Sequence, residues 1–272
     1  MKNIYILIFS TLLISSVKIY ANVSVEQTAR LKSTGGVGVG AVLLDEATLL
    51  NPAPMAFYQI GAVYYQKTKL SNEKPGSENT NTVYIASDSK GPVGGSVSYQ
   101  QNNETKLINV SLATPVSDKS AMGVTYRSFE GASGEKSNSI DIGVSHAISP
   151  FFTLGALVKN PQRQKEFDTR FILGSQFVYK DFISIMLDIG SDWENTLSSD
   201  MVYGAGLQFK TFQDFYLRLG SSYDRKLKVK NSGVGLSWVS PKILVNLSVS
   251  NIEEETTAVT TKDSSFSVSY KF

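Results

Sequence analysis

Five charged side chains fall where a water-filled interior would use them. In extended segments, residues alternate between two faces, and these five lie on the polar face: Arg127, Asp141, Arg170, Asp188 and Arg218. Arg127 and Asp141 belong to neighbouring segments, so they can pair across strands. Charges are costly against lipid and tolerable against water or each other. The pattern predicts lumen-lining residues that either solvate the interior and pair across strands, or hold a plug and line a passage.

Catalytic and metal chemistry are not expected. His146 is the only histidine and shares the apolar face of its segment, whereas Ser145 lies on the opposite face and cannot pair with it. The glycine run Gly35–Gly40 is not followed by the Lys-Ser/Thr of a phosphate loop. Cysteine is absent, and no His or carboxylate cluster has metal-ligand spacing. We therefore expect neither an enzyme nor a cofactor or metal, with a barrel enzyme the third-ranked alternative.

The N-terminus has the layout of a secretory signal peptide. Lys2 precedes an apolar core from Ile4 to about Ile14, and small or polar residues follow as far as Ala21. The alternative, a membrane anchor, usually needs a longer apolar run of about 20 residues. Removing residues 1–21 also removes Lys2 and Lys18, which leaves 24 basic and 24 acidic residues. This balance gives no electrostatic reason to expect nucleic acid as a partner.

From Gln59 onwards the chain is regular. Fourteen segments have strand character, with lengths near the roughly 9–11 residues of a tilted membrane strand. They are 59–69, 82–88, 92–101, 105–114, 119–129, 137–148, 151–159, 168–180, 182–191, 200–210, 213–223, 228–239, 242–250 and 263–272. The segments that start at 82 and 92 have the weakest alternation.

The connections between these segments differ in length by parity. Those after even-numbered segments are short, such as Lys180–Asp181, and those after odd-numbered segments are mostly longer and polar, such as Asn251–Lys262. Outer-membrane barrels have this arrangement, whereas a soluble sandwich has no reason for it. Residues 59–272 are therefore predicted to form an all-β, transmembrane antiparallel β-barrel of about 14 strands in a bacterial outer membrane.

The final segment carries the clearest alternation. Small polar residues alternate with four larger apolar ones, and the chain stops on an aromatic residue: Phe266, Val268, Tyr270 and Phe272. This looks like the closing strand of bacterial outer-membrane barrels, where such residues resemble the signal read by the barrel assembly machinery. An edge strand of a soluble sheet is the alternative.

Residues 22–58 do not look like barrel wall, because glycine and proline interrupt them. We expect a compact, irregular piece with a short helix around Asp45 to Leu50. Its end reads D-E-A-T-L-L-N-P-A-P, and the matching residues Asp45, Ala47, Asn51, Pro52 and Ala53 resemble the N-terminal hatch of the FadL-type long-chain fatty-acid outer-membrane transporters. That family usually continues with Gly where this chain has Pro54. A plain turn is the alternative for Asn51 to Ala53.

The resemblance implies a fourteen-stranded barrel with a hatch in its lumen, which takes up hydrophobic small molecules such as long-chain fatty acids. It implies outer-membrane lipid and a hydrophobic ligand as partners. In that family a kink in the third strand opens a lateral exit, and Gly94 and Gly95 would supply it here. If the inner-face charges hold the hatch, Asp45 and Glu46 could meet an inner-face Arg. The chain is short for this family, and a related branch serves protein secretion. A non-transporting structural or secretion-associated barrel is therefore the alternative.

Overall fold

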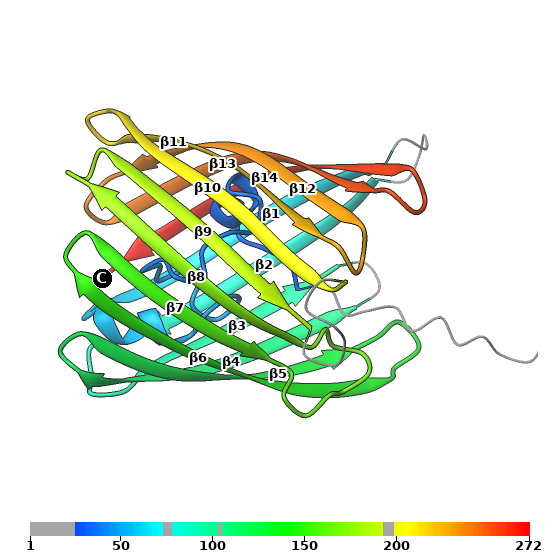
Figure 1. The fold of residues 1–272 in the computed structure, drawn as a ribbon, viewed down its shortest axis with the longest axis horizontal. Helices are drawn as coiled ribbons and strands as arrows, with labels where there is room; N and C mark the ends of the chain where they lie inside the picture. The colour runs from blue at the N-terminus through cyan, green and yellow to red at the C-terminus, as the bar shows by residue number, and fades with distance from the viewer. Residues whose placement is uncertain (1–24, 73–77, 103–104, 193–198) are drawn as a thin grey trace, which may run out of the picture.

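A computed structural model describes residues 25–72, 78–102, 105–192 and 199–272. They form one closed antiparallel barrel with a chain segment inside it (Figure 1). The predicted signal peptide, residues 1–21, lies outside the described residues. The fourteen strands are β1 (Gly61–Asn72), β2 (Glu78–Asp88), β3 (Gly94–Gln101), β4 (Lys106–Ser117), β5 (Ser120–Glu130), β6 (Lys136–Ser149), β7 (Phe152–Lys159), β8 (Arg170–Tyr179), β9 (Ile183–Ser191), β10 (Met201–Phe212), β11 (Phe215–Asp224), β12 (Val229–Val239), β13 (Ile243–Glu254) and β14 (Val259–Lys271).

Each strand pairs with its sequence neighbours, and the barrel closes where β14 meets β1. At that seam, Gly61 N–H donates to the Phe272 carbonyl at 3.1 Å, and Phe272 N–H donates back to the Gly61 carbonyl at 2.9 Å. The fourteen segments predicted from alternation are all strands, including the two weakest. The predicted closed barrel is confirmed.

The two faces of the wall differ as alternation requires. On β14 the side chains of Phe266 and Tyr270 are exposed outside, as is Phe272 directly after the strand, whereas Ser265, Ser267 and Ser269 are buried inside. Every strand presents exposed apolar side chains outward: Val63, Tyr84, Val97, Val110, Val124, Ile142, Leu154, Leu173, Leu187, Tyr203, Leu219, Leu236, Leu247 and Phe266. A closed barrel with a continuous apolar exterior is that of an outer-membrane protein, because only lipid can cover such a surface.

Within the described residues, no helix has the length and apolar character needed to cross a membrane.

The two ends of the barrel have different connections. At the end that holds the C-terminus, Lys180 and Asp181 form a two-residue hairpin turn with φ of 47° and 55°, which suits a type I′ turn. At the other end, β13 and β14 stay paired out to Glu254 and Val259 (Figure 1). The predicted loop from Asn251 to Lys262 is therefore wrong in extent. The β13–β14 hairpin continues beyond the apolar belt. There its residues still pair across the two strands, but apolar and polar side chains no longer alternate.

The chain before β1 lies inside the barrel, and we call residues 25–58 the luminal segment. It contains α2 (Ala29–Ser33) and the 3-10 helix η1 (Ala53–Phe57). The short helix expected around Asp45 to Leu50 is only a turn, with Leu50 N–H donating to the Glu46 carbonyl at 2.8 Å. Asn51-Pro52 prevents its continuation, because the residue before a proline avoids helical geometry and proline has no N–H to donate.

Candidate functional site

The luminal segment has an apolar core of its own that includes inner-face side chains of the wall. Leu31, Val37, Val39, Leu43 and Leu50 cluster with wall residues of β7 and β9, namely Leu157 and Met186. Two further clusters join the segment to β1, β2 and β4: Leu44, Ala47, Met55, Ala62 and Ala113 form one, and Leu49, Tyr64, Val83 and Ile85 form the other. Burial of these side chains holds the segment in the lumen, because each removes apolar surface from water.

A band of inner-face glycines lets the backbone of the luminal segment lie directly against the wall. We call these residues the glycine band: Gly123, Gly143, Gly155, Gly174, Gly204, Gly206, Gly220, Gly233 and Gly235, from β5 to β12. A Cβ added at Gly155 would lie 2.2 Å from the Val39 carbonyl oxygen, and one at Gly233 would lie 1.9 Å from the Lys32 carbonyl oxygen. Real Cβ atoms do not approach so closely. Side chains at these positions would therefore push the luminal segment off the wall.

Asn51 joins two parts of the luminal segment to the wall. Its Nδ2 donates to the carbonyl oxygens of Val39 at 2.8 Å and of Val144 on β6 at 3.2 Å, and its Oδ1 accepts from Ala53 N–H at 3.1 Å. Pro52 precedes η1 and lies against Gly123. The Asn-Pro-Ala motif thus forms a turn, as its alternative interpretation expected. The same turn also joins the segment to β6 through the hydrogen bond from Asn51 to Val144.

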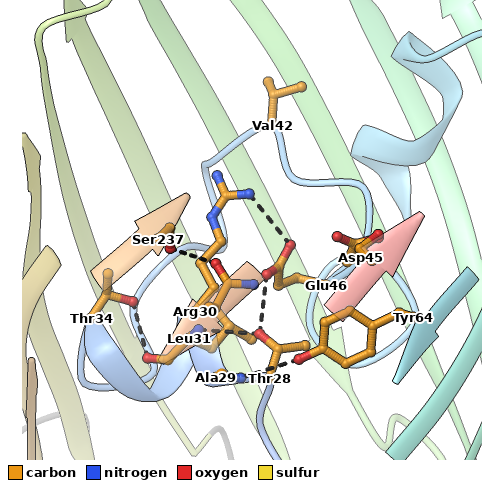
Figure 2. Close-up of polar contacts among 12 residues, drawn as sticks. Thr28, Ala29, Arg30, Leu31, Thr34, Val42, Asp45, Glu46, Tyr64 and Ser237 are labelled. Atoms are coloured by element: carbon orange, nitrogen blue, oxygen red, sulfur yellow. Dashed lines mark hydrogen bonds and ion pairs between the residues drawn. The ribbon is translucent and has the colours of Figure 1, made fainter. Parts of the chain in front are cut away.

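Among the described residues, Asp45 and Glu46 form no ion pair with an inner-face arginine, so the expected direct contact is wrong. Asp45 Oδ1 accepts from Ser269 Oγ at 3.1 Å, and Glu46 lies 3.9 Å from Arg30, which belongs to the luminal segment itself. Figure 2 shows Arg30 and Thr28 both directed at the Glu46 carboxylate. The nearest ion-pair partner of Glu46 is therefore a residue of the segment itself, whereas Asp45 bonds a serine of β14.

A pH dependence follows from the burial of Asp45. Burial and, secondly, the Glu46 carboxylate raise the pKa of Asp45 to about 6, although Ser269 lowers it. The folded protein then holds this proton more tightly than the unfolded chain, so ionisation costs stability progressively from about pH 4 to about pH 6. We expect the stability of Asp45→Asn, relative to wild type, to increase across that window in urea titrations. Asp181→Asn in an exposed turn is the control, and an Asp45→Asn difference that stays constant with pH would contradict the expectation.

Arg127 and Asp141 lie on β5 and β6 and form a buried ion pair at 2.7 Å. Arg127 also donates to Asn109 Oδ1 at 3.1 Å and to the carbonyl of Leu49 in the luminal segment at 3.3 Å. Both interpretations of this residue therefore describe part of its environment, since it pairs across strands and also touches the segment.

The other three predicted lumen-lining residues occupy separate places. Asp188 accepts from Gly38 N–H at 2.8 Å and from Val39 N–H at 3.0 Å, so it anchors the luminal segment on β9. Arg170 lies near the end of the barrel opposite the C-terminus, where it pairs with Asp168 at 2.8 Å and Asp224 at 2.7 Å. Arg218 donates to Gln208 at 2.7 Å and to Asn246 at 3.3 Å. The five charges therefore form no single cluster.

Sequence reasoning missed a buried ion network around Lys32. Its ammonium contacts Glu26, Asp263 Oδ2 of β14 at 2.7 Å and Thr68 Oγ1 of β1 at 3.3 Å. Glu26 also accepts from Asn81 Nδ2 of β2 at 2.9 Å. Lys32 is only 4% exposed. The available signal in the sequence was weak: Asp263 is a lone acidic residue on the inner face of β14, where the other inner-face residues are mostly serines.

Gly94 and Gly95 do not kink β3. Its pairing with β2 runs from Thr82↔Gln101 to Asp88↔Gly95, and its pairing with β4 from Gly94↔Ala113 to Gln101↔Lys106, without a register shift. The expected lateral opening by a kink is therefore wrong. Gly94 serves close packing instead, because a Cβ there would lie 3.2 Å from Met55 Cγ of η1.

His146 lies on the outer face, as its alternation predicted, but it has a partner that the sequence reasoning did not consider. Ser120 on the neighbouring strand β5 hydrogen-bonds to His146 Nδ1 at 2.8 Å, and both residues lie near the C-terminal end of the barrel. Within the part of the chain that the structure describes, Ser120 is the hydrogen-bond partner of this imidazole and no carboxylate contacts it. Among the described residues, no cluster of three or more His, Cys, Asp and Glu could hold a metal ion.

Two cavities border the luminal segment at the end opposite the C-terminus. The larger has a volume of about 240 Å³ and is lined by Glu26, Lys32, Leu227, Val229, Ile252 and Asp263, among others. The smaller has a volume of about 70 Å³ and is lined by residues that include Glu26, Gln100 and Phe129. Sites for drug-sized ligands are larger, at about 300–1,000 Å³. In this arrangement neither cavity accommodates a long acyl chain.

The sequence matches no family model and no curated protein. The structure is similar to CymD, a monoaromatic hydrocarbon channel, with a TM-score of 0.68 and 12% identity over 92% of this chain and 98% of that one. It is similar to the toluene transporter TbuX of Ralstonia pickettii, with a TM-score of 0.68 and 12% identity over 91% and 98%. A Pseudomonas aeruginosa FadL homologue gives 0.62 and 11% over 90% and 98%. This chain has the fold of the FadL-type outer-membrane transporters, as its strand count and the motif from Asp45 to Ala53 indicated.

Proposed function

We propose that this protein is an outer-membrane channel for the uptake of hydrophobic small molecules, with the luminal segment acting as its hatch. One observation carries the proposal: a closed, lipid-facing barrel holds a folded N-terminal segment across its lumen. A barrel that served only as a scaffold would not need such a segment. The similar structures support the proposal, because they include a monoaromatic hydrocarbon channel and toluene transporters.

The contacts of the hatch indicate which side of the lumen would open. Towards β5–β12 the hatch lies backbone to backbone on the glycine band. Towards β1–β3 and β14 it is held by side chains: apolar contacts such as Leu49 with Val83 and Ile85, and polar ones such as Ala29 N–H on Gln66 Oε1 at 2.6 Å and Lys32 on Asp263. Water or a polar group of a ligand can replace hydrogen bonds one by one, whereas close backbone packing must separate as a unit. We infer that the passage forms along β1–β3 and β14.

Two classes of hydrophobic ligand are compatible with this function, and they differ in size. Long-chain fatty acids are the class that the hatch motif suggested, and they require the hatch to move, because the cavities beside it are small. A single-ring hydrocarbon needs less displacement. Uptake of radiolabelled oleate and of radiolabelled toluene, measured side by side in the same cells, separates the two.

The absence of cysteine allows a direct test of hatch movement. Thr48 of the hatch and Ser96 of β3 have their hydroxyls in contact, so Thr48→Cys with Ser96→Cys places two thiols for a hatch-to-wall disulfide. We expect oxidation to reduce uptake to the level of cells that lack the protein, and a reductant to restore it. Ser111→Cys with Thr125→Cys is the control, because their hydroxyls lie 2.7 Å apart and bond each other, so that bridge would join β4 to β5 within the wall.

The results distinguish the proposal from its rival. Uptake that continues at the full rate in the oxidised hatch-to-wall variant would show that the hatch does not gate. A second candidate function, a structural or secretion-associated barrel that transports nothing, is favoured by the close seating of the hatch on the glycine band. That candidate predicts no uptake of either compound above background, whether the disulfide is oxidised or reduced.

A further inference from the structure

The larger of the two cavities beside the hatch has both charged and apolar lining. Of the described residues that line it, three are charged, namely Glu26, Lys32 and Asp263. The apolar lining comes from the start of the hatch and from β12, β13 and the turn before β12: Val25, Leu227, Val229 and Ile252. Its volume is about 240 Å³, and one water occupies roughly 30 Å³ of liquid, so the cavity has room for a single ring with a short chain.

The charged lining carries an excess of one negative charge. The carboxylates of Glu26 and Asp263 share the single ammonium of Lys32. Lys32 and Asp263 are only 4% and 3% exposed, so water screens them little. No other cation is among the described residues that line the cavity. The cavity therefore favours a positively charged ligand group and disfavours an anion.

Two buried oxygen atoms of the lining have no donor. Asp263 Oδ2 accepts from Lys32 Nζ at 2.7 Å, but Asp263 Oδ1 accepts no hydrogen bond from any described residue. The same holds for Asn231 Oδ1. A buried acceptor without a donor costs free energy that a bonded acceptor does not. A ligand that brings a donor to each of these atoms would recover that cost.

The two acceptors lie on strands that are separated by a third. Asn231 of β12 pairs with Ile252 of β13, and Asp263 of β14 pairs with Ser250 of β13. Neighbouring strands are about 4.8 Å apart, so β12 and β14 are separated by roughly 10 Å. Ile252 belongs to the strand between them and lines the same cavity. This spacing suits an elongated ligand with a donor at each end and an apolar middle.

We propose that this cavity binds a small amphiphile that has an ammonium group at one end and a hydroxyl group at the other. The ammonium lies between the carboxylates of Glu26 and Asp263 and donates to Asp263 Oδ1. The hydroxyl donates to Asn231 Oδ1, and the apolar middle packs on Ile252 and Leu227. Tyramine, in which an aromatic ring separates the two donors, has this chemistry. The inference does not depend on the proposed transport function, because binding is measured directly.

The test is isothermal titration calorimetry of the purified full-length protein, with titration into detergent alone subtracted. Four compounds share one skeleton: tyramine has both donors, phenethylamine lacks the hydroxyl, 4-ethylphenol lacks the ammonium, and 3-(4-hydroxyphenyl)propionate has a carboxylate instead. We expect phenethylamine to bind about fivefold more weakly than tyramine, as loss of one neutral hydrogen bond predicts. We expect 4-ethylphenol to bind at least about tenfold more weakly, because it loses a charge-assisted contact, and the propionate not to bind.

Asn231→Leu tests the hydroxyl end by itself. Asn231 takes no part in the ion network of Lys32, so the hatch should stay seated, which its resistance to protease verifies. We expect this variant to bind tyramine about fivefold more weakly and phenethylamine as wild type does. Asn251→Leu is the matched control, because alternation places its side chain on the outward face of β13, and it should bind tyramine as wild type does.

Four results would overturn the proposal. Failure of wild type to bind tyramine would show that the cavity holds only water. Equal binding of tyramine and 4-ethylphenol would show that the carboxylates do not recognise the ligand. An equal loss of both amines in Asn231→Leu would show that Asn231 acts through the shape of the cavity. Displacement of tyramine by sodium ions as effectively as by phenethylamine would show a site for inorganic cations.

Discussion

Gly155→Val is expected to displace the luminal segment from its seat while the barrel remains closed. A Cβ at this position would lie 2.2 Å from the Val39 carbonyl oxygen and 2.8 Å from the Gly40 Cα. Both are backbone atoms, so no side-chain rotation relieves the overlap. Valine is itself a good strand residue, so β7 should still pair with its neighbours. The strain therefore falls on the contact between wall and hatch, with a cost of about 1–3 kcal/mol for overpacking.

The measurement is ion conductance of the purified protein in planar bilayers, together with proteolysis of the hatch. We expect Gly155→Val to give larger and more frequent openings than wild type, and faster cleavage of residues in the hatch. Gly95→Val is the matched control, because its Cβ would meet only Leu112 Cδ2 at 3.8 Å, an ordinary contact. If Gly155→Val conducted as wild type and its hatch were equally protected, the glycine band would not be what seats the hatch.

The glycine band shows why the wall could be predicted from the sequence and the seat of the hatch could not. Alternation is a local property, so the outward face of β14 follows from the spacing of Phe266, Tyr270 and Phe272 alone. A glycine at an inner position, such as Gly143, reads equally as a weak strand residue. Its purpose appears only when Asn51 lies against it, and no local pattern joins residues so far apart in the chain.

The same limit applies to the charged residues. Arg127 and Asp141 sit on adjacent strands, so hairpin topology was enough to bring them together. Lys32 and Asp263 are 231 residues apart and meet only because the N-terminal segment enters the barrel beside the last strand. The resemblance of Asp45 to Ala53 to a hatch motif placed the segment in the lumen, but it did not specify the partners of that segment.

Loss of the Lys32 ammonium is the second change with a large expected effect. Lys32→Met leaves the Asp263 carboxylate buried without its cation, and removing one partner of a buried pair typically costs about 3–5 kcal/mol. We expect the hatch to become accessible to protease and the urea midpoint of hatch exposure to fall. Lys230→Met should change little, because its pair with Glu253 is 3.6 Å apart and exposed, and such surface pairs contribute about 0–1 kcal/mol.

A double-mutant cycle identifies the cause. Asp263→Asn removes the charge that Lys32→Met strands, so the double variant should recover much of the stability that Lys32→Met loses. Recovery would show that the Lys32 contact with β14 acts as a latch on the side of the lumen where we infer the passage. If the two losses simply added, Lys32 would act through Glu26 instead, and the latch would lie towards β2 and β3, where Glu26 contacts Asn81 and Gln100. Either result assigns the hatch contact that must break first when the channel opens.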